Sequence, residues 1–262
     1  MSYNFGIGVI TRNRFEYLSK CLETIYKHHP KYEYNIDAPL IVGDDASDEN
    51  IVDTMVSYYH EQSEDSNGHV LHFRKQRGMS ANIKQVYDFA ESYLNLDYLF
   101  FTVNDFYCTR EIDFPALLQF MEDNPKVGQI QFVHWKGELN DKKRERANFN
   151  WTTEFHKPKK DRNPVEVDEW VQVGEERIRK TTYSFVNLPA ITRLHACDIT
   201  RGTLEAERRK GESPDKYIQR MELRWVKNWY DTGLENWEID PDTQPFLGMD
   251  INITNRTGNI MA

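Results

Sequence analysis

Short apolar runs alternate with helical patterns over the first half of the chain. Between the runs, apolar residues recur at the i, i+3, i+4 spacing of helices that bury one face. Strands that alternate with helices of 10 to 15 residues predict a mostly parallel central sheet with helices on both faces, an α/β fold. The runs that we expect to be strands cover residues 5–10, 39–43, 69–73, 98–103 and 127–134.

Capping residues predict where several helices begin and end. Ser80 is expected to cap a helix that follows Gly78, and Asp113 one that has Pro115 in its first turn. A further helix is predicted from Ser213-Pro214 to about Asp231 and closes at Gly233.

The hydrophobic periodicity disappears over residues 136–180, where charged residues become more frequent. We therefore expect a charged loop there, within one compact domain. An α/β half would cover residues 1–135, and a second half residues 136–262.

Composition describes a folded, aromatic-rich chain. Of 262 residues, 39% are hydrophobic, and the chain has 14 Tyr, 14 Phe and 6 Trp. The net charge of −9 disfavours a general nucleic-acid binder. No apolar run or leader pattern predicts membrane insertion or secretion, so we expect a cytoplasmic protein whose Cys21, Cys108 and Cys197 are reduced structural thiols.

Polar clusters follow four of the predicted strands. The carboxyl ends of strands in an open α/β sheet meet at one crevice, so we expect these clusters to converge. Any one of them alone would be ordinary turn and cap chemistry. The clusters are Thr11 to Arg14, Asp44-Asp45, Arg77 to Asn82 and Asn104-Asp105.

Two of the clusters could either bind a nucleotide or serve only as turn and cap residues. Asp44 or Asp45 could accept a hydrogen bond from a base ring N–H, or the segment could merely cap the next helix. Arg77 beside Gly78 could place its fork-shaped cation near diphosphate oxygens, or lie in a solvated turn. The loop after the first strand lacks the glycines of a dinucleotide fingerprint, which disfavours NAD.

With these motifs in order, residues 5 to about 123 resemble the GT-A fold glycosyltransferases of the family-2 type. The likeness rests on Thr11-Arg12-Asn13-Arg14, on Asp44-Asp45-Ala46-Ser47-Asp48 and on Gly78-Met79-Ser80-Ala81-Asn82. The acidic metal motif after residues 98–103 is the fourth match, although the usual Asp-x-Asp is here Val103-Asn104-Asp105.

The resemblance implies that residues 1–135 bind a nucleotide-sugar donor, a UDP-sugar first, and that residues 136–262 form the acceptor-binding and catalytic half. It implies that Asp45, with or without Asp44, contacts the base, and that Asp105 holds Mn²⁺ or Mg²⁺. One carboxylate with substrate oxygens can suffice for such a metal, so its affinity without nucleotide should be poor. The predicted donor-binding residues are Thr11, Arg12, Asn13, Asp44, Asp45, Arg77, Asn82 and Asn104.

The predicted catalytic base is Glu222, on the helix after Ser213. It falls on a stripe with Ile218, Trp225 and Trp229, and a carboxylate on an apolar face is expensive unless it is paired or used. The open alternative is a structural ion pair with an arginine such as Arg193. Asp215, in the first turn, is the second candidate base.

The acceptor prediction rests on Lys142 to Arg162, which carries eight basic and three acidic residues with four interleaved aromatic or histidine side chains. Such a segment suits a polyanion with bases that can be drawn out and stacked. A hydroxymethylated base in DNA is thus one acceptor; a solvated loop, with a glycan or protein as acceptor, is the alternative.

Two other functions stay open. A sugar-phosphate nucleotidylyltransferase would share the sheet but wants a glycine-rich basic signature after the first strand, which Thr11 to Arg14 does not supply. A non-catalytic nucleic-acid- or glycan-binding module is compatible with the incomplete metal motif.

Overall fold

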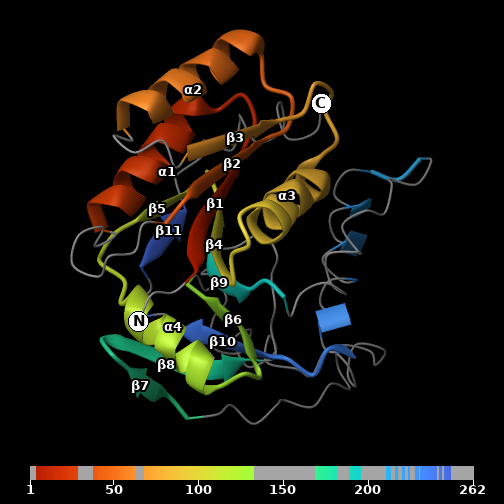
Figure 1. Ribbon diagram of the computed structural model, residues 1–262. Coiled ribbons are helices and arrows are strands. Elements are labelled where there is room, and N and C mark those ends of the chain that lie inside the picture. The colour runs from red at the N-terminus through yellow and green to blue at the C-terminus, as the bar shows by residue number, and fades with distance from the viewer. Residues whose placement is uncertain are drawn as a thin grey trace.

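A nine-stranded sheet runs through the computed structural model, which describes residues 4–28, 38–62, 68–132, 169–181, 189–195 and, with short gaps, 211–248. The strand order is β3-β2-β1-β4-β9-β6-β10-β8-β7, and β8 and β9 run against the other seven (Figure 1). The fold is therefore α/β with a mostly parallel central sheet, as expected. The strands are β1 Phe5–Thr11, β2 Leu40–Asp44, β3 Gly68–His72, β4 Tyr98–Val103, β6 Val127–Gln131, β7 Val171–Val173, β8 Glu176–Thr181, β9 Ala190–Arg193 and β10 Glu235–Ile239, while β5 Phe106–Cys108 and β11 Phe246–Gly248 form a separate pair.

Helices cover both faces of the sheet. Helices α1, α2 and α4 pack with one apolar cluster, and α3 packs with the other, together with the buried side chains of Met221 and Trp229. The helices are α1 Phe15–His28, α2 Glu49–Gln62, α3 Met79–Asp88, continued by the π-helix η1 Phe89–Tyr93, and α4 Phe114–Asp123.

Strand β1 is buried along its whole length because it lies between β2 and β4 and has a helix on each face. Its glycines bring α3 close to the sheet. A Cβ on Gly8 would lie 2.7 Å from a methyl carbon of Val86, and one on Gly43 of β2 would lie 2.6 Å from the other methyl of Val86. The later part of α3 therefore packs directly on β1 and β2.

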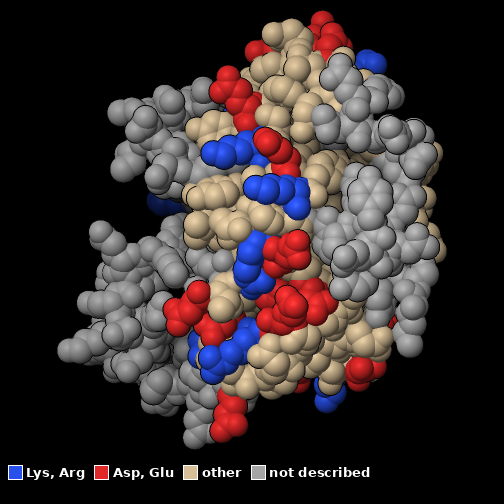
Figure 2. All heavy atoms as spheres, turned by 90° about the vertical axis from the view of Figure 1, so that its left-hand side faces the viewer, with Lys and Arg blue, Asp and Glu red and all other residues tan. Residues whose placement is uncertain are grey.

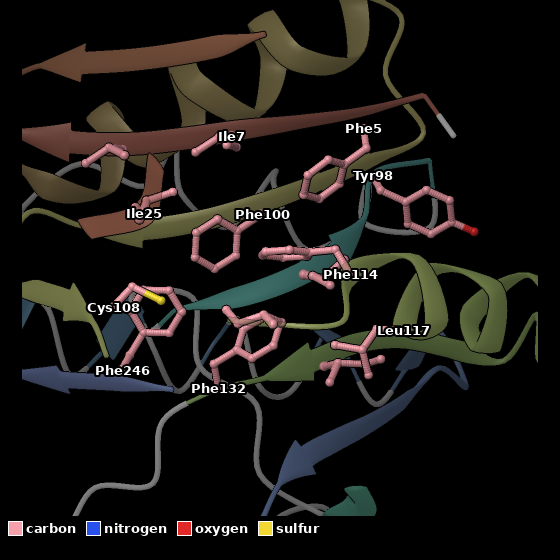
Figure 3. Packing of buried hydrophobic residues seen from close by; sticks show 14 of the residues in the cluster. Phe5, Ile7, Ile25, Tyr98, Phe100, Cys108, Phe114, Leu117, Phe132 and Phe246 are labelled. Atoms are coloured by element: carbon pink, nitrogen blue, oxygen red, sulfur yellow. The ribbon is translucent and has the colours of Figure 1, made fainter. Parts of the chain in front are cut away.

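Aromatic rings fill the core on the α4 side of the sheet (Figure 3). The ring of Phe100 lies 5.4 Å from those of Phe114 and Phe246 and 5.6 Å from that of Phe132, centroid to centroid. These rings come from β4, α4, β11 and the end of β6. The cluster thus joins the parallel strands to the later part of the chain.

The second half of the sheet differs from the sequence prediction. Residues 171–181, expected as the end of a charged loop, form the hairpin β7–β8 at the sheet edge, with Gly174 at φ +56° in its turn. The expectation was wrong there because the charges of β8 are used across the sheet. Arg179 pairs with Glu238 of β10 at 2.7 Å, so a charged sequence forms a strand without an apolar run.

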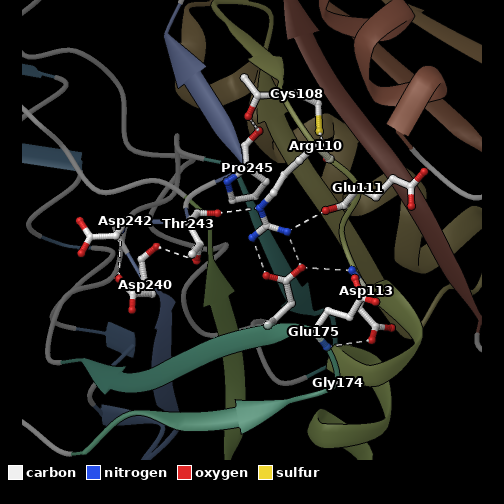
Figure 4. Close-up of polar contacts among 12 residues, drawn as sticks. Cys108, Arg110, Glu111, Asp113, Gly174, Glu175, Asp240, Asp242, Thr243 and Pro245 are labelled. Carbon is white, nitrogen blue, oxygen red and sulfur yellow. Dashed lines mark hydrogen bonds and ion pairs between the residues drawn. The ribbon is translucent and has the colours of Figure 1, made fainter.

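A buried ion pair fixes this hairpin to the rest of the molecule (Figure 4). Both terminal nitrogens of Arg110 bond the carboxylate of Glu176, at 2.8 and 2.7 Å, and the Glu176 side chain is fully buried. Arg110 also donates from Nε to the Thr243 carbonyl at 2.7 Å. One guanidinium therefore connects β8 to the segments beside β5 and β11.

Two of the three capping predictions are confirmed. The Asp113 carboxylate accepts from the Ala116 backbone N–H at 3.1 Å at the start of α4. Described residues between 216 and 231 are helical, the backbone N–H of Tyr217 donates to the Ser213 carbonyl, and Gly233 has φ +71°. Ser80 is not a cap: it lies buried inside α3, which begins after Gly78.

Cys21 and Cys108 are free and buried, as expected. Burial raises the pKa of both thiols, that of Cys108 to about 11, so both are protonated at neutral pH. Cys197 lies outside the described residues.

Candidate functional site

The four polar clusters lie at the carboxyl ends of β1, β2, β3 and β4, which are adjacent parallel strands. Hydrogen bonds connect the clusters in series. The backbone N–H of Asp45 donates to the Thr11 carbonyl at 3.2 Å, and that of Asn104 donates to the Ile10 carbonyl at 3.2 Å. The convergence expected from the strand order is present.

The loops after β1 and β2 are cross-linked through Asn13. Its backbone N–H donates to Ser47 Oγ at 2.7 Å, and its side-chain oxygen accepts from the Asp48 backbone N–H at 2.9 Å. Asn13 and Ala46 both have positive φ, 50° and 61°. Asn13 is thus a positioning residue that holds the two loops together.

Asp44 is fully buried and its carboxylate is used inside the protein. It accepts from the Ser47 backbone N–H at 2.8 Å and from the Ser47 hydroxyl, and it pairs with His72 Nδ1 at 2.8 Å. These bonds join the ends of β2 and β3. Asp44 therefore shapes the loop, and any contact with a base falls more readily to its neighbour.

Asp45 organises the start of α3. Its two carboxylate oxygens accept from the backbone N–H groups of Arg77 and Gly78, at 2.7 and 2.9 Å. Gly78 has φ +92°, a conformation that a side chain would strain, and α3 has no side-chain cap. The exposed Arg77 guanidinium lies 5.2 Å from the centroid of the Phe73 ring. A cation and a helix N-terminus thus lie beside the strand ends.

Asn82 is 2% exposed, and its amide holds strand ends in place. The nitrogen donates to the Gly43 carbonyl at 3.0 Å and to the Thr11 carbonyl at 3.4 Å, and the oxygen accepts from Gln85 Nε2. Asn82 therefore acts on the site through the backbone of β1 and β2.

The turn after β4 brings Asn104 and Asp105 to the loop after β1. Asn104 Nδ2 donates to Thr11 Oγ1 at 2.8 Å, and Asp105 Oδ1 pairs with Arg14 Nη1 at 2.8 Å. Asn104 is 6% exposed, whereas the Asp105 side chain is 30% exposed. Asp105 is the more accessible of the two, and its carboxylate is a hard oxygen donor of the kind that Mg²⁺ binds.

The two predicted catalytic carboxylates, Glu222 and Asp215, lie outside the described residues, as does the basic segment Lys142 to Arg162. Arg12 lies half-buried in the turn after β1. Arg193, the alternative partner of Glu222, donates to the carbonyls of Met121 and Val127, and its guanidinium lies 5.0 Å from the centroid of the Tyr98 ring. The catalytic assignment therefore stays a prediction.

Sequence reasoning missed two side chains that build this site. His72 pairs with Asp44 across 28 residues of sequence, and Arg14 pairs with Asp105 across 91. His72 was predicted only as part of a strand, and Arg14 only as part of a polar loop. Only the register of β1 with β4 and of β2 with β3 would have suggested them as partners.

Comparisons with known proteins point in one direction. The family model described as glycosyl transferase family 2 matches residues 7–178, about two thirds of the chain. No curated protein matches. In the described part of the chain, no helix has the length and apolar character needed to cross a bilayer.

Two solved structures share the fold at low sequence identity. S. aureus TarS 1–349 in complex with UDP has a TM-score of 0.56 and 14% identity, over 95% of this chain and 60% of that one. GalNAc-T7 with UDP, GalNAc and Mn²⁺ has a TM-score of 0.58 and 9% identity, over 90% of this chain and 42% of that one. The chain thus spans about 60% of TarS 1–349, and these likenesses establish the fold.

Proposed function

The chain belongs to glycosyltransferase family 2, with a GT-A fold, and we propose that it moves a sugar from a nucleotide-diphosphate sugar to a hydroxyl acceptor. The observation that carries the proposal is the convergence of four polar loops at the ends of β1 to β4, interlocked by Asn13, Asp45 and Asn104. A rigid edge of this kind is where open α/β sheets bind ligands.

For the donor we favour a UDP-sugar. TarS structures with UDP and with UDP-GlcNAc, and the UDP-bound GalNAc-T7, support this choice of nucleotide. The Asp45 end of β2 would receive the base, and Arg77 with the uncapped start of α3 would face the diphosphate. Thr11 and Asn13 would border the nucleotide from the loop after β1.

The residues at the end of β4 fit a divalent metal that is shared with the donor. Asp105 offers an accessible carboxylate, and Asn104 keeps an amide oxygen while its nitrogen bonds Thr11. The described residues contain no group of three or more His, Cys, Asp or Glu that could hold a metal alone. When bound, Mn²⁺ or Mg²⁺ would neutralise the leaving diphosphate.

We propose an inverting single displacement with Glu222 as the base and Asp215 as the second candidate. The acceptor hydroxyl would give its proton to the Glu222 carboxylate as its oxygen bonds the anomeric carbon and the diphosphate leaves. Met221, next to Glu222 in the sequence, and Trp229, seven residues after it, are buried, which supports an apolar setting for that carboxylate. Such a setting raises a carboxyl pKa towards neutrality.

For the acceptor we propose a hydroxymethylated base in DNA, on the strength of the basic and aromatic residues from Lys142 to Arg162. Figure 2 shows cations and carboxylates interleaved along the face turned to the viewer. A mixed face of this kind gives a polyanion little net attraction, so the basic segment would have to supply it. A glycan or protein hydroxyl is the other acceptor class.

The donor test is the thermal midpoint of the full chain with UDP, GDP, CDP and TDP, each with Mn²⁺ and with EDTA. A ligand at 100 times its Kd stabilises by about 2.7 kcal/mol, a shift of a few degrees. We expect a shift with UDP that requires Mn²⁺. Glu222→Gln should keep the shift and lose turnover, whereas Asp105→Ala should lose the metal-dependent part. No shift with any nucleotide would refute the proposed donor class and favour a binding module.

A further inference from the structure

Of the described carboxylates assigned to the proposed donor site, Asp44 and Asp45 are buried and Asp105 is partly exposed, and Asp105 forms an ion pair with Arg14. The two paired atoms lie 2.8 Å apart, and the Arg14 and Asp105 side chains are only 18% and 30% exposed. Arg14 comes from the turn after β1 and Asp105 from the turn after β4, so the contact bridges two strand ends. The guanidinium also lies 5.7 Å from the centroid of the Tyr17 ring.

This pair leaves Asp105 a poor metal ligand while the nucleotide is absent. The positive charge of Arg14 already balances the carboxylate, and a second cation placed there would lie beside a guanidinium. Among the described residues, no cluster of three or more His, Cys, Asp or Glu could bind the metal elsewhere. A dication must therefore compete with the charge of Arg14 for this carboxylate, whose Oδ1 is already bonded.

We propose that Arg14 is a further donor-binding residue, which exchanges Asp105 for the diphosphate of the nucleotide-sugar. Arg14 leaves Asp105 when the diphosphate arrives, and the freed carboxylate becomes a metal ligand. Charge balances before and after: the two positive charges of the metal and the one of Arg14 match the negative charge of Asp105 and the two on the phosphate groups of the single diphosphate. The inference rests on the proposed function and makes metal and nucleotide binding mutually dependent.

Arg14 is suited to this exchange because a guanidinium binds carboxylate and phosphate oxygens with the same planar fork. Its backbone stays fixed during the exchange, because the Arg14 carbonyl accepts from the Leu18 N–H at 3.0 Å at the start of α1. Only the side chain has to turn.

The test is a titration of the full chain with Mn²⁺, with and without UDP. The electron paramagnetic resonance signal of free Mn²⁺ measures how much of the metal is bound. Wild type should bind Mn²⁺ weakly alone and more tightly with UDP. Removing the competing cation in Arg14→Gln should strengthen Mn²⁺ binding without UDP by about tenfold, and weaken UDP binding in Mn²⁺ by about tenfold, the scale of one charged hydrogen bond.

Three further variants separate charge, site and fold. Arg14→Lys keeps the cation and should bind Mn²⁺ alone as weakly as wild type, and it serves if Arg14→Gln does not fold. Asp105→Asn should lose Mn²⁺ binding in both states. Lys20→Ala removes a cation that lies over the Tyr107 ring, 5.4 Å from its centroid, and should change neither affinity.

The outcomes distinguish this inference from the proposed function. If wild type binds UDP with Mn²⁺ but Arg14→Gln alters neither affinity, the exchange is overturned and the donor class stands. If the affinity of wild type for UDP is unchanged by EDTA and Arg14→Gln no longer binds UDP, Arg14 holds the diphosphate without a metal. That result also overturns the exchange. If wild type binds no nucleotide, the proposed function itself fails.

Discussion

The two halves of the sheet are held together by different interactions. In β3-β2-β1-β4 the strands are joined by apolar burial and by short polar loops that bond one another's backbone. In the half that contains β10, β8 and β7, two ion pairs join β8 to β10, Arg179 with Glu238 and Lys180 with Glu235. A third, Arg110 with Glu176, joins β8 to the segment after β5. The first half is therefore held by apolar packing and backbone hydrogen bonds, and the second half depends on charge pairing.

The largest expected effect is in the second half. Arg110→Ala leaves the carboxylate of Glu176 buried without its guanidinium, and removing one partner of a buried pair typically costs about 3–5 kcal/mol. The free energy of unfolding in urea measures the loss. Lys180→Ala is the matched control: its pair with Glu235 is partly exposed, so the cost should stay below about 1 kcal/mol. Equal losses in the two variants would contradict a special role for the buried pair.

A packing change in the first half should have an intermediate effect. In Gly43→Ala the new Cβ would lie 2.5 Å from Asn82 Oδ1 and 2.6 Å from Val86, and overpacking of this kind costs about 1–3 kcal/mol. Because α3 begins beside the donor site, the nucleotide-induced rise in the thermal midpoint should shrink as well. Gly248→Ala, which meets no atom within 4 Å, should change neither quantity. An unchanged nucleotide response in Gly43→Ala would separate α3 from donor binding.

The smallest expected effect concerns one buried asparagine in each half of the sheet, Asn236 in the second half and Asn82 in the first. Among the described residues, neither amide atom of buried Asn236 has a hydrogen-bond partner, so Asn236→Leu should raise the free energy of unfolding by about 1 kcal/mol. Asn82→Leu should lower it, because the Asn82 amide bonds the Gly43 and Thr11 carbonyls. Chemical denaturation of both variants checks the opposite signs. A loss in Asn236→Leu would mean that its amide is satisfied in solution.

Sequence patterns predicted the first half well because its strands are continuous apolar runs followed by local turn chemistry. Strand β1 and the Asp44-Asp45 end of β2 agree with the expectation, whereas α3 is capped at Gly78, two residues before the expected cap Ser80. The GT-A family-2 resemblance read from those motifs is confirmed by the family match. Local order in sequence was enough here, since each motif lies directly after its strand.

The second half could not be read in the same way. Strand β8, Glu176–Thr181, alternates charges with small apolar content, and only its partners on β10 make it a strand. Strand β9, Ala190–Arg193, is too short to give a periodic signal. In the site, the pairing of Arg14 with Asp105 depends on the register of two strands and not on any local pattern.

The position of β9 has a consequence for how the molecule is made. Ala190–Arg193 lies between β4 and β6, and it bonds both of them. During synthesis on the ribosome, β4 is made about ninety residues before its partner β9. Until β9 is made, the edge of β4 that contains Phe100 and Phe101 has no strand paired to it. Such an edge can pair with a neighbouring nascent chain. A chain that stops before Ala190 would leave one edge of β4 and one edge of β6 without the strand that pairs with both.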